Sequence, residues 1–242
     1  MQLGKIHINK AYLGLTELTP SNAFLGTNPV IDTPQTITFV DLGLPSGTLW
    51  ASHNIGVDVT DLDQAQKWYG DLFAWGETET KSTFKDDNYK FFRYDLEDTM
   101  FKCTKYMSNT YWTFPGYTPD NKEVLDSSDD VATVTFGPGY SLPSESQVRE
   151  LVEYTTLSTV TDYQDIPGLN GTILTGTNNK HIFFPRDTQS EHFYHWLNTR
   201  KASGLKTRDI DAVDFIIGTS LDIDTDNRPE PHRIRAVKNP QA

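Results

Sequence analysis

The chain of 242 residues contains a single cysteine, Cys103, so no disulfide can form within it and packing alone must hold the fold. It also lacks any apolar run long enough to span a bilayer. Basic residues are in the minority, since 21 Lys and Arg stand against 33 Asp and Glu for a net charge of −12. Such a charge repels nucleic-acid backbones and anionic lipids. We therefore expect neither nucleic-acid binding nor membrane insertion.

The short motifs of the common enzyme classes are also missing. There is no nucleophile elbow, zinc-binding HExxH motif, P-loop or Rossmann glycine fingerprint. A pair of carboxylates for glycoside hydrolysis could be drawn from the many acidic residues, but no motif selects one. These absences favour a protein that is not an enzyme and needs no cofactor, and they leave a polysaccharide-degrading enzyme as the least favoured alternative.

The first 35 residues are predicted to form a separate arm. They contain no apolar segment of about 7–15 residues behind a basic start, so we expect no secretory signal and synthesis in a cytoplasm. A short repeat runs through them, because AYLG at 11–14 is echoed by AFLG at 23–26. Each copy predicts a small strand closed by a glycine turn, and two copies are too few to bury their own apolar faces. The apolar residues of the repeat would then pack on a neighbouring subunit, or alternatively fold back on their own domain: Tyr12, Leu13, Phe24 and Leu25.

From residue 36 onward the pattern predicts many short strands, long loops and few helices. Strands are expected at 37–39 and 49–51 around a Pro-Gly turn, and a hairpin is expected between 172–174 and 181–184. Further strand-like stretches are found at 193–198, 213–220 and 232–238. Such a mixture is typical of an α+β domain.

The clearest predicted helix begins at Ser144, which can cap it while Gln147 closes a capping box. Its spacing places Val148, Leu151 and Val152 on one buried face.

Aromatic residues are dense in the loop-rich segment between residues 77 and 130. They are interleaved with Gly, Pro, Thr and Asn, a mixture that suits rings stacking on sugars or anchoring a protein interface. The alternative is that these rings fill the core of a loop-rich domain, as we expect for Trp50 and Trp75 in the strand motifs. The residues of this group are Tyr106, Tyr111, Trp112, Phe114 and Tyr117.

Two polar patterns have spacings found in metal sites. Asp222, Asp224 and Asp226 occupy alternate positions, as at the opening of a calcium loop, but the twelfth position is Arg233 where such a loop needs a glutamate. We keep them as a weak calcium candidate, with a solvated acidic loop as the alternative. A histidine pair at 192 and 195 lies in a strand-like setting that would point the two rings to opposite faces, so we expect no metal there.

Several segments, in order, resemble one known family. They are VDLGLPSGTLWA at 40–51, YGDLFAWGETETKSTFKDDNYKF at 69–91, SLPSESQVRELVE at 141–153, YHWLNTR at 194–200 and RIRAVK at 233–238. This series is similar to the Fibrobacter succinogenes major paralogous (FISUMP) domain, which occurs in surface proteins of gut Bacteroidetes and in virion proteins of their crAss-like phages. The resemblance covers roughly residues 36–238.

The resemblance implies a C-type-lectin-like fold for residues 36–242, rich in short strands and long loops. It also implies a ligand face around Tyr194, Trp196, Asn198 and Arg200, to which we add the loop residues Tyr111, Trp112 and Tyr117. Calcium-dependent sugar binding is doubtful, because the triplet at 228–230 is Arg-Pro-Glu and matches neither Glu-Pro-Asn nor Gln-Pro-Asp.

The function implied is that of a phage virion structural protein, a head or tail fibre assembled in the host cytoplasm and extracellular when mature. Residues 1–35 would dock on other virion proteins, and the lectin-like domain would bind a host-surface glycan or protein, as a homo-oligomer that gains from repeated contacts. Two alternatives stay open: a connector or decoration protein that contacts only other virion proteins, and a bacterial surface adhesin.

Overall fold

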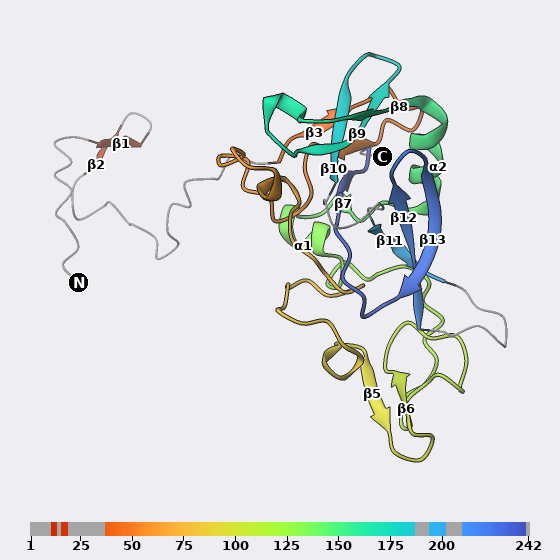
Figure 1. Ribbon diagram of the computed structural model, residues 1–242. Helices are drawn as coiled ribbons and strands as arrows, with labels where there is room; N and C mark the ends of the chain where they lie inside the picture. Colours follow the sequence, from red (N-terminus) through yellow and green to blue (C-terminus); the bar gives the residue numbers. More distant parts are fainter. Residues whose placement is uncertain (1–10, 14–15, 19–36, 187–193, 202–209, 241–242) are drawn as a thin grey trace. The chain divides into compact units, whose positions relative to one another are not determined.

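The computed structural model describes residues 11–13, 16–18, 37–186, 194–201 and 210–240 (Figure 1). The chain divides into two compact units, residues 1–34 and 35–242. In the first unit, β1 (Ala11–Leu13) pairs antiparallel with β2 (Thr16–Leu18). The first copy of the repeat therefore contains a strand, whereas the second copy, with Phe24 and Leu25, lies outside the described residues.

In its described part, the second unit is built from small antiparallel sheets and few helices, which confirms the coarse expectation of short strands. No described helix has the length and apolar character needed to cross a membrane. The first two sheets have the strand orders β3 (Phe39–Asp41), β4 (Leu49–Ala51), β14 (Val237–Lys238), β7 (Tyr140–Ser141), and β10 (His181–Arg186), β9 (Asn170–Gly176), β8 (Thr155–Val160). The other two have the orders β11 (Tyr194–Arg200), β12 (Asp211–Ile217), β13 (Leu221–Asn227), and β5 (Phe92–Asp95), β6 (Met100–Cys103). The helices are α1 (Val131–Phe136) and α2 (Glu145–Tyr154), with short 3-10 turns η1 (Ala65–Trp68), η2 (Asp86–Asn88) and η3 (Tyr163–Asp165).

The β3–β4–β14–β7 sheet joins the two ends of the second unit. Between β3 and β4 the predicted turn is present, with the Gly47 amide donating to the Leu44 carbonyl at 2.9 Å and Gly47 at a φ of 74°. Val237 of β14 then pairs with Trp50 of β4 on one side and with Ser141 of β7 on the other. The closing strand is therefore hydrogen-bonded between two segments that precede it by about a hundred residues or more.

Helix α2 begins as predicted. Ser144 accepts a hydrogen bond from the Gln147 amide, and the Gln147 side chain accepts one from the Ser144 amide. Val148 and Leu151 are buried, but the prediction for Val152 is wrong, because its side chain is 46% exposed. Successive residues are separated by about 100° around the axis of a helix. The buried stripe is centred between Val148 and Leu151, and Val152, about 100° from Leu151, lies at its edge.

Two large apolar clusters form the core. One packs Trp50 and α2 against the sheets of β8–β10 and β11–β13, and the other surrounds Trp75 and Trp196. Trp50 and Trp75 are fully buried, as predicted. Arg235 is buried as well, and it donates to backbone carbonyls of Ala51 and Phe183, both at 3.0 Å. Burial lowers the pKa of Arg235 to about 9, which leaves the guanidinium charged at neutral pH.

The β5–β6 hairpin lies at the opposite end of the second unit from the β8–β10 sheet (Figure 1). It belongs to the long excursion between residues 77 and 130 that was predicted to be mostly loop. Irregular backbone around it is held by isolated bridges, from Cys103 to Thr113 and from Val124 to Thr199. The same excursion carries the aromatic residues that the sequence singled out.

Candidate functional site

The aromatic loop, defined as residues 104–121, runs beside β6. The Cys103 amide donates to the Trp112 carbonyl at 2.7 Å, and the Phe114 amide donates to the Cys103 carbonyl at 2.8 Å. Tyr111 is 61% exposed and Tyr117 is 50% exposed, while Trp112 is partly buried with its ring edge-on to Tyr111 at a centroid distance of 5.1 Å. Two of the three predicted loop residues thus present about half a ring or more to solvent, and the third supports one of them.

Tyr106 has a different role from its neighbours, because it is fully buried. Its ring packs edge-on against Trp75 and Phe91, at centroid distances of 5.0 and 5.4 Å. Its hydroxyl donates to Asp129 Oδ2 at 2.7 Å and accepts from the Asp126 amide at 2.9 Å. Of the two interpretations given for these rings, core packing is the correct one for Tyr106. Its side chain anchors the aromatic loop to the core of the second unit.

An ion-pair network extends the anchor. Asp129 faces Lys90 Nζ at 2.7 Å and Lys105 Nζ at 2.5 Å, and Lys105 also reaches Asp126 at 2.6 Å. Burial alone would raise the pKa of Asp129, but hydrogen bonds from Lys105, Lys90 and Tyr106 outweigh it and hold that pKa below its ordinary value. The carboxylate therefore stays ionised as the common acceptor under the aromatic loop.

Large exposed apolar side chains gather in the same part of the chain. Eight large apolar side chains are exposed among the described residues, and five of these lie between residues 94 and 124: Tyr94, Leu96, Tyr111, Tyr117 and Val124. Single exposed apolar residues are ordinary, so it is their concentration in one segment of the chain that marks this segment as a candidate interaction site. We call these five residues the exposed apolar group.

The four predicted ligand residues of β11 do not form one exposed face. Trp196 is fully buried, with its indole Nε1 donating to the Phe73 carbonyl at 2.9 Å, and the prediction that it contacts a ligand is wrong. The same holds for Arg200, which is 2% exposed and donates from Nε to the Lys122 carbonyl at 2.7 Å. Tyr194 and Asn198 are half-buried. The β11 strand is covered because other segments lie against it, through the bridges of Val124 to Thr199 and of His195 to Arg233.

The acidic run at 222–226 is a strand and not a loop. It forms most of β13, which pairs along its whole length with β12. Alternate residues of a strand point to one face and lie about 6.6–6.8 Å apart, so Asp222, Asp224 and Asp226 spread along the strand and cannot wrap around one ion. The weak prediction of a calcium loop built from these three residues is therefore corrected.

The sheet does bring Asp226 together with residues that the sequence did not single out. Asp214 lies directly opposite Asp224 on β13 and opposite Trp196 on β11, so the aspartates share a face with the buried indole. His232 enters this face from the C-terminal segment, with Nε2 2.9 Å from Asp214 Oδ2 and 3.5 Å from Asp226 Oδ2. We call Asp214, Asp226 and His232 the carboxylate–histidine cluster.

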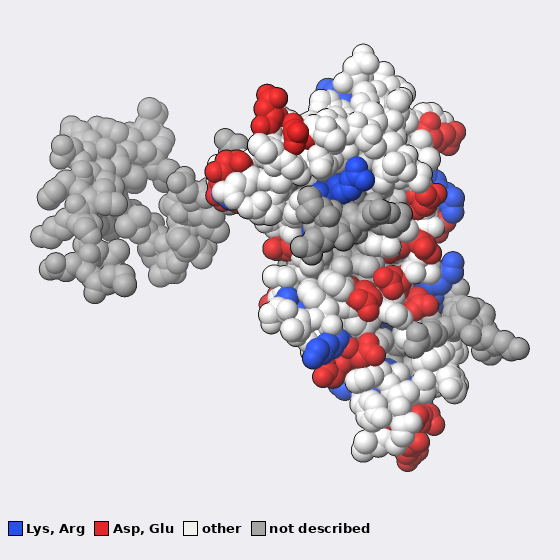
Figure 2. All heavy atoms as spheres, in the orientation of Figure 1, with Lys and Arg blue, Asp and Glu red and all other residues white. Residues whose placement is uncertain are grey.

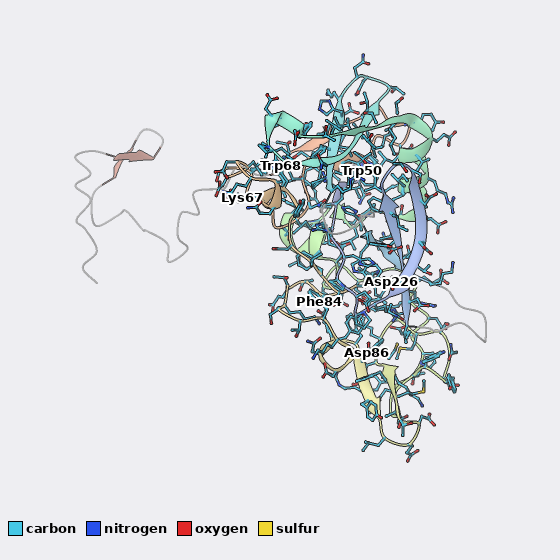
Figure 3. All side chains as sticks on the ribbon, viewed as in Figure 1. Trp50, Lys67, Trp68, Phe84, Asp86 and Asp226 are labelled. Carbon is cyan, nitrogen blue, oxygen red and sulfur yellow. The ribbon has the colours of Figure 1, made fainter. Side chains whose placement is uncertain are left out.

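The cluster is enclosed on most sides. Its imidazole stacks between the Trp196 and Tyr194 rings, at centroid distances of 4.0 and 5.1 Å. Asp214 is 1% exposed, and its Oδ1 has no hydrogen-bond partner among the described residues. Burial raises the pKa of Asp214, and the hydrogen bond from His232 only partly offsets this. Asp226, whose side chain is 38% exposed, is the member that faces solvent, and it lies near the end of β13 (Figure 3).

A shallow polar cleft of about 350 Å³ opens between α2 and the β11–β13 sheet. Its walls carry both signs of charge, from Glu145, Arg149, Lys201 and Asp224 among others, and Arg149 already pairs with Glu145 at 2.5 Å. Figure 2 shows the same mixture over the visible face of the second unit, with a group of carboxylates over the lower part of β13.

Comparisons with family models, with curated proteins and with solved structures gave no significant match to this chain. Membership of the FISUMP family and the lectin-like fold thus stay predictions that rest on the motifs. The features of the described residues that bear on function are the exposed apolar group, the anchored aromatic loop and the carboxylate–histidine cluster.

Proposed function

We propose that the chain is a virion appendage protein, a head or tail fibre whose second unit binds a glycan or protein of the host surface through the exposed apolar group. The observation that carries the proposal is the gathering of five exposed apolar side chains between residues 94 and 124. Tyrosine rings combine a flat apolar face with a polar hydroxyl, which suits both sugar stacking and protein interfaces.

The support beneath the aromatic loop strengthens the proposal. A ligand that must first order a loop loses part of its binding energy, so a loop that is held in place before binding gives higher affinity. Tyr106 and Asp129 provide such a hold, because their hydrogen bonds join the loop to the buried side chains of the second unit. Tyr111 and Tyr117 would then meet a ligand with little loss of freedom.

The first unit is the docking arm in this proposal. An isolated two-stranded hairpin is marginally stable in water, so a segment that contains only β1 and β2 in its described part gains from packing on another protein. The apolar residues of the repeat, Tyr12, Leu13, Phe24 and Leu25, would make that contact with other virion proteins. Removal of residues 1–30 should then abolish incorporation into particles and leave the second unit folded, which circular dichroism of the truncated chain would check.

The finer fold assignment belongs to the same proposal. A capped helix, a hairpin and a closing strand beside the first strands of the unit follow in the order that a C-type-lectin-like domain has. The function does not depend on that assignment, because a fold hosts many functions and the site must be argued from its own residues.

The test is a double variant, Tyr111→Ser with Tyr117→Ser, scored for incorporation into particles and for adsorption to host cells. Both side chains are exposed, so folding should be retained. The matched control, Val134→Ser with Tyr154→Ser, removes two exposed apolar side chains outside residues 94–124. Loss of adsorption by intact particles in the first variant alone would support the proposal.

Two other results would overturn it. If the first variant fails to enter particles, the exposed apolar group is an interface between virion proteins and the chain is a connector or decoration. If both variants adsorb as well as the parent, the group has no part in attachment.

A further inference from the structure

We propose that the carboxylate–histidine cluster, Asp214, Asp226 and His232, is a binding site for a divalent transition-metal cation of the zinc type. The three ligand atoms come from β12, β13 and the C-terminal segment, and they all lie within 4.8 Å of one another. This inference is independent of the proposed host-surface binding, which uses other residues at another part of the second unit.

The distances fit an ion with short bonds. Zinc binds imidazole nitrogen and carboxylate oxygen at about 2.0–2.2 Å, so neighbouring ligand atoms on a tetrahedral ion lie about 3.3–3.6 Å apart. The two measured separations from His232 Nε2, 2.9 Å to Asp214 and 3.5 Å to Asp226, are close to that range. A small outward shift of one carboxylate would admit the ion.

An unused buried acceptor is the second reason. Asp214 Oδ1 is buried in the sheet without a hydrogen-bond partner in the described part of the chain, and an unpaired buried carboxylate oxygen is costly. Asp224 lies directly opposite Asp214 on the neighbouring strand, where like charges are unfavourable. A cation at the cluster would neutralise the carboxylate that carries this lone oxygen and offset its repulsion from Asp224.

The ligand types select the class of cation. Calcium and magnesium take oxygen ligands, and calcium needs six to eight of them, whereas an imidazole with two carboxylates suits zinc and similar ions. Three protein ligands leave one coordination position of a tetrahedral ion for water. Because Asp226 is partly exposed, this position would be open to solvent beside it.

Binding would require the imidazole hydrogen to leave Nε2. In the metal-free protein His232 Nε2 can donate its hydrogen to Asp214, and a neutral ring that binds the ion through Nε2 carries its one hydrogen on Nδ1, so this change of tautomer releases no net proton. His232 Nδ1 has no partner among the described residues, so no neighbouring group there fixes the ring tautomer against this change. Because protonation of the imidazole and carboxylate ligands competes with the ion, binding should weaken as the pH falls.

The experiment titrates zinc chloride into the full-length chain, freed of metal by a chelator, in an isothermal calorimeter. The wild-type chain should bind zinc with micromolar or tighter affinity. Asp226→Asn, a change at a part-exposed position that should leave the fold intact, should weaken that binding at least tenfold. Asp222→Asn is the control, since it removes the same charge from the same face of β13 four residues away and should leave affinity within about twofold.

A second measurement keeps the test independent of other weak zinc ligands in the chain. Cobalt(II) bound at the cluster should give visible absorption of a four-coordinate ion in the wild type and in Asp222→Asn, but not in Asp226→Asn. Equal binding by all three proteins, no saturable binding at millimolar zinc, or tighter binding of calcium than of zinc would each overturn the proposal.

Discussion

Replacing Tyr106 with Phe tests how the aromatic loop is held. The substitution keeps the ring, and with it the edge contacts to Trp75 and Phe91, but it deletes the hydroxyl. Two hydrogen bonds are lost, the donation to Asp129 at 2.7 Å and the acceptance from the Asp126 amide at 2.9 Å. Because the ring stays in place, the change in stability reports on the hydroxyl alone.

The size of the effect follows from the two bonds. A hydrogen bond to a charged group contributes about 1.5–3 kcal/mol and one between neutral groups about 0.5–1.5 kcal/mol. Asp129 keeps its ion pairs with Lys90 and Lys105, which softens the first loss, so we expect the free energy of unfolding to fall by about 2–3 kcal/mol. With a urea dependence of about 3 kcal/mol per molar, the midpoint should move down by about 0.7–1 M.

The assay is urea unfolding followed by tryptophan fluorescence, since the Trp75 ring lies beside Tyr106. Tyr111→Phe is the matched control, because the same atom is removed from a ring that is mostly exposed, and its stability should stay within about 0.5 kcal/mol of the parent. If Tyr106→Phe also stays within that margin, or if the control loses as much, the hydroxyl does not anchor the loop and our account of its rigidity fails.

Three further outcomes are expected. The pKa of Asp129 lies below its ordinary value in the folded chain, so the carboxylate stabilises the fold fully above about pH 4, and this stabilisation is lost as the pH falls through the folded-state pKa. In thermal melts across this range, Asp129→Asn should therefore lose less stability on acidification than the parent. Trp196→Ala should lower the free energy of unfolding by about 3–5 kcal/mol in the same urea assay, because a buried indole is removed, and a nearly neutral result would show that the indole does not stabilise the core. Asp224→Asn should raise the stability of the metal-free chain by about 0.2–1 kcal/mol in scanning calorimetry, since it removes the like charge opposite Asp214. A loss of stability would show that the other contacts of Asp224 outweigh this repulsion.

Local signals in the sequence predicted local structure well. The turn at 44–47, the capping box of α2 and the hairpin of β9 and β10 all depend on residues within a few positions of one another, and all are present. The error at Val152 has the opposite cause. Helical spacing tells which residues share a stripe, but the centre of the buried stripe depends on what the helix packs against, and that comes from distant segments.

The candidate site was harder to predict for the same reason. Exposure decides whether an aromatic residue can meet a ligand, and neighbours in sequence do not determine exposure. Tyr106 and Tyr111 lie five positions apart in one loop, yet one is fully buried and the other is mostly exposed. The difference comes from Asp129 and Trp75, which approach Tyr106 from outside the loop.

The carboxylate–histidine cluster combines one feature that a pattern can predict with one that it cannot. Residues 221–227 alternate apolar or neutral side chains with aspartates, a period of two that indicates a strand, and a hairpin with 211–217 would place Asp214 opposite Asp224. That pairing was within reach of the sequence, although the same aspartates also match the spacing of a calcium loop. His232 was not within reach, because it joins the cluster through a segment held by the bridge to Phe73, a pairing across more than 150 residues. The register of one hairpin could thus have placed two of the three proposed ligand residues, Asp214 and Asp226, on one face. The third, His232, could be found only in the folded chain, and the choice of a zinc-type cation depends on its imidazole.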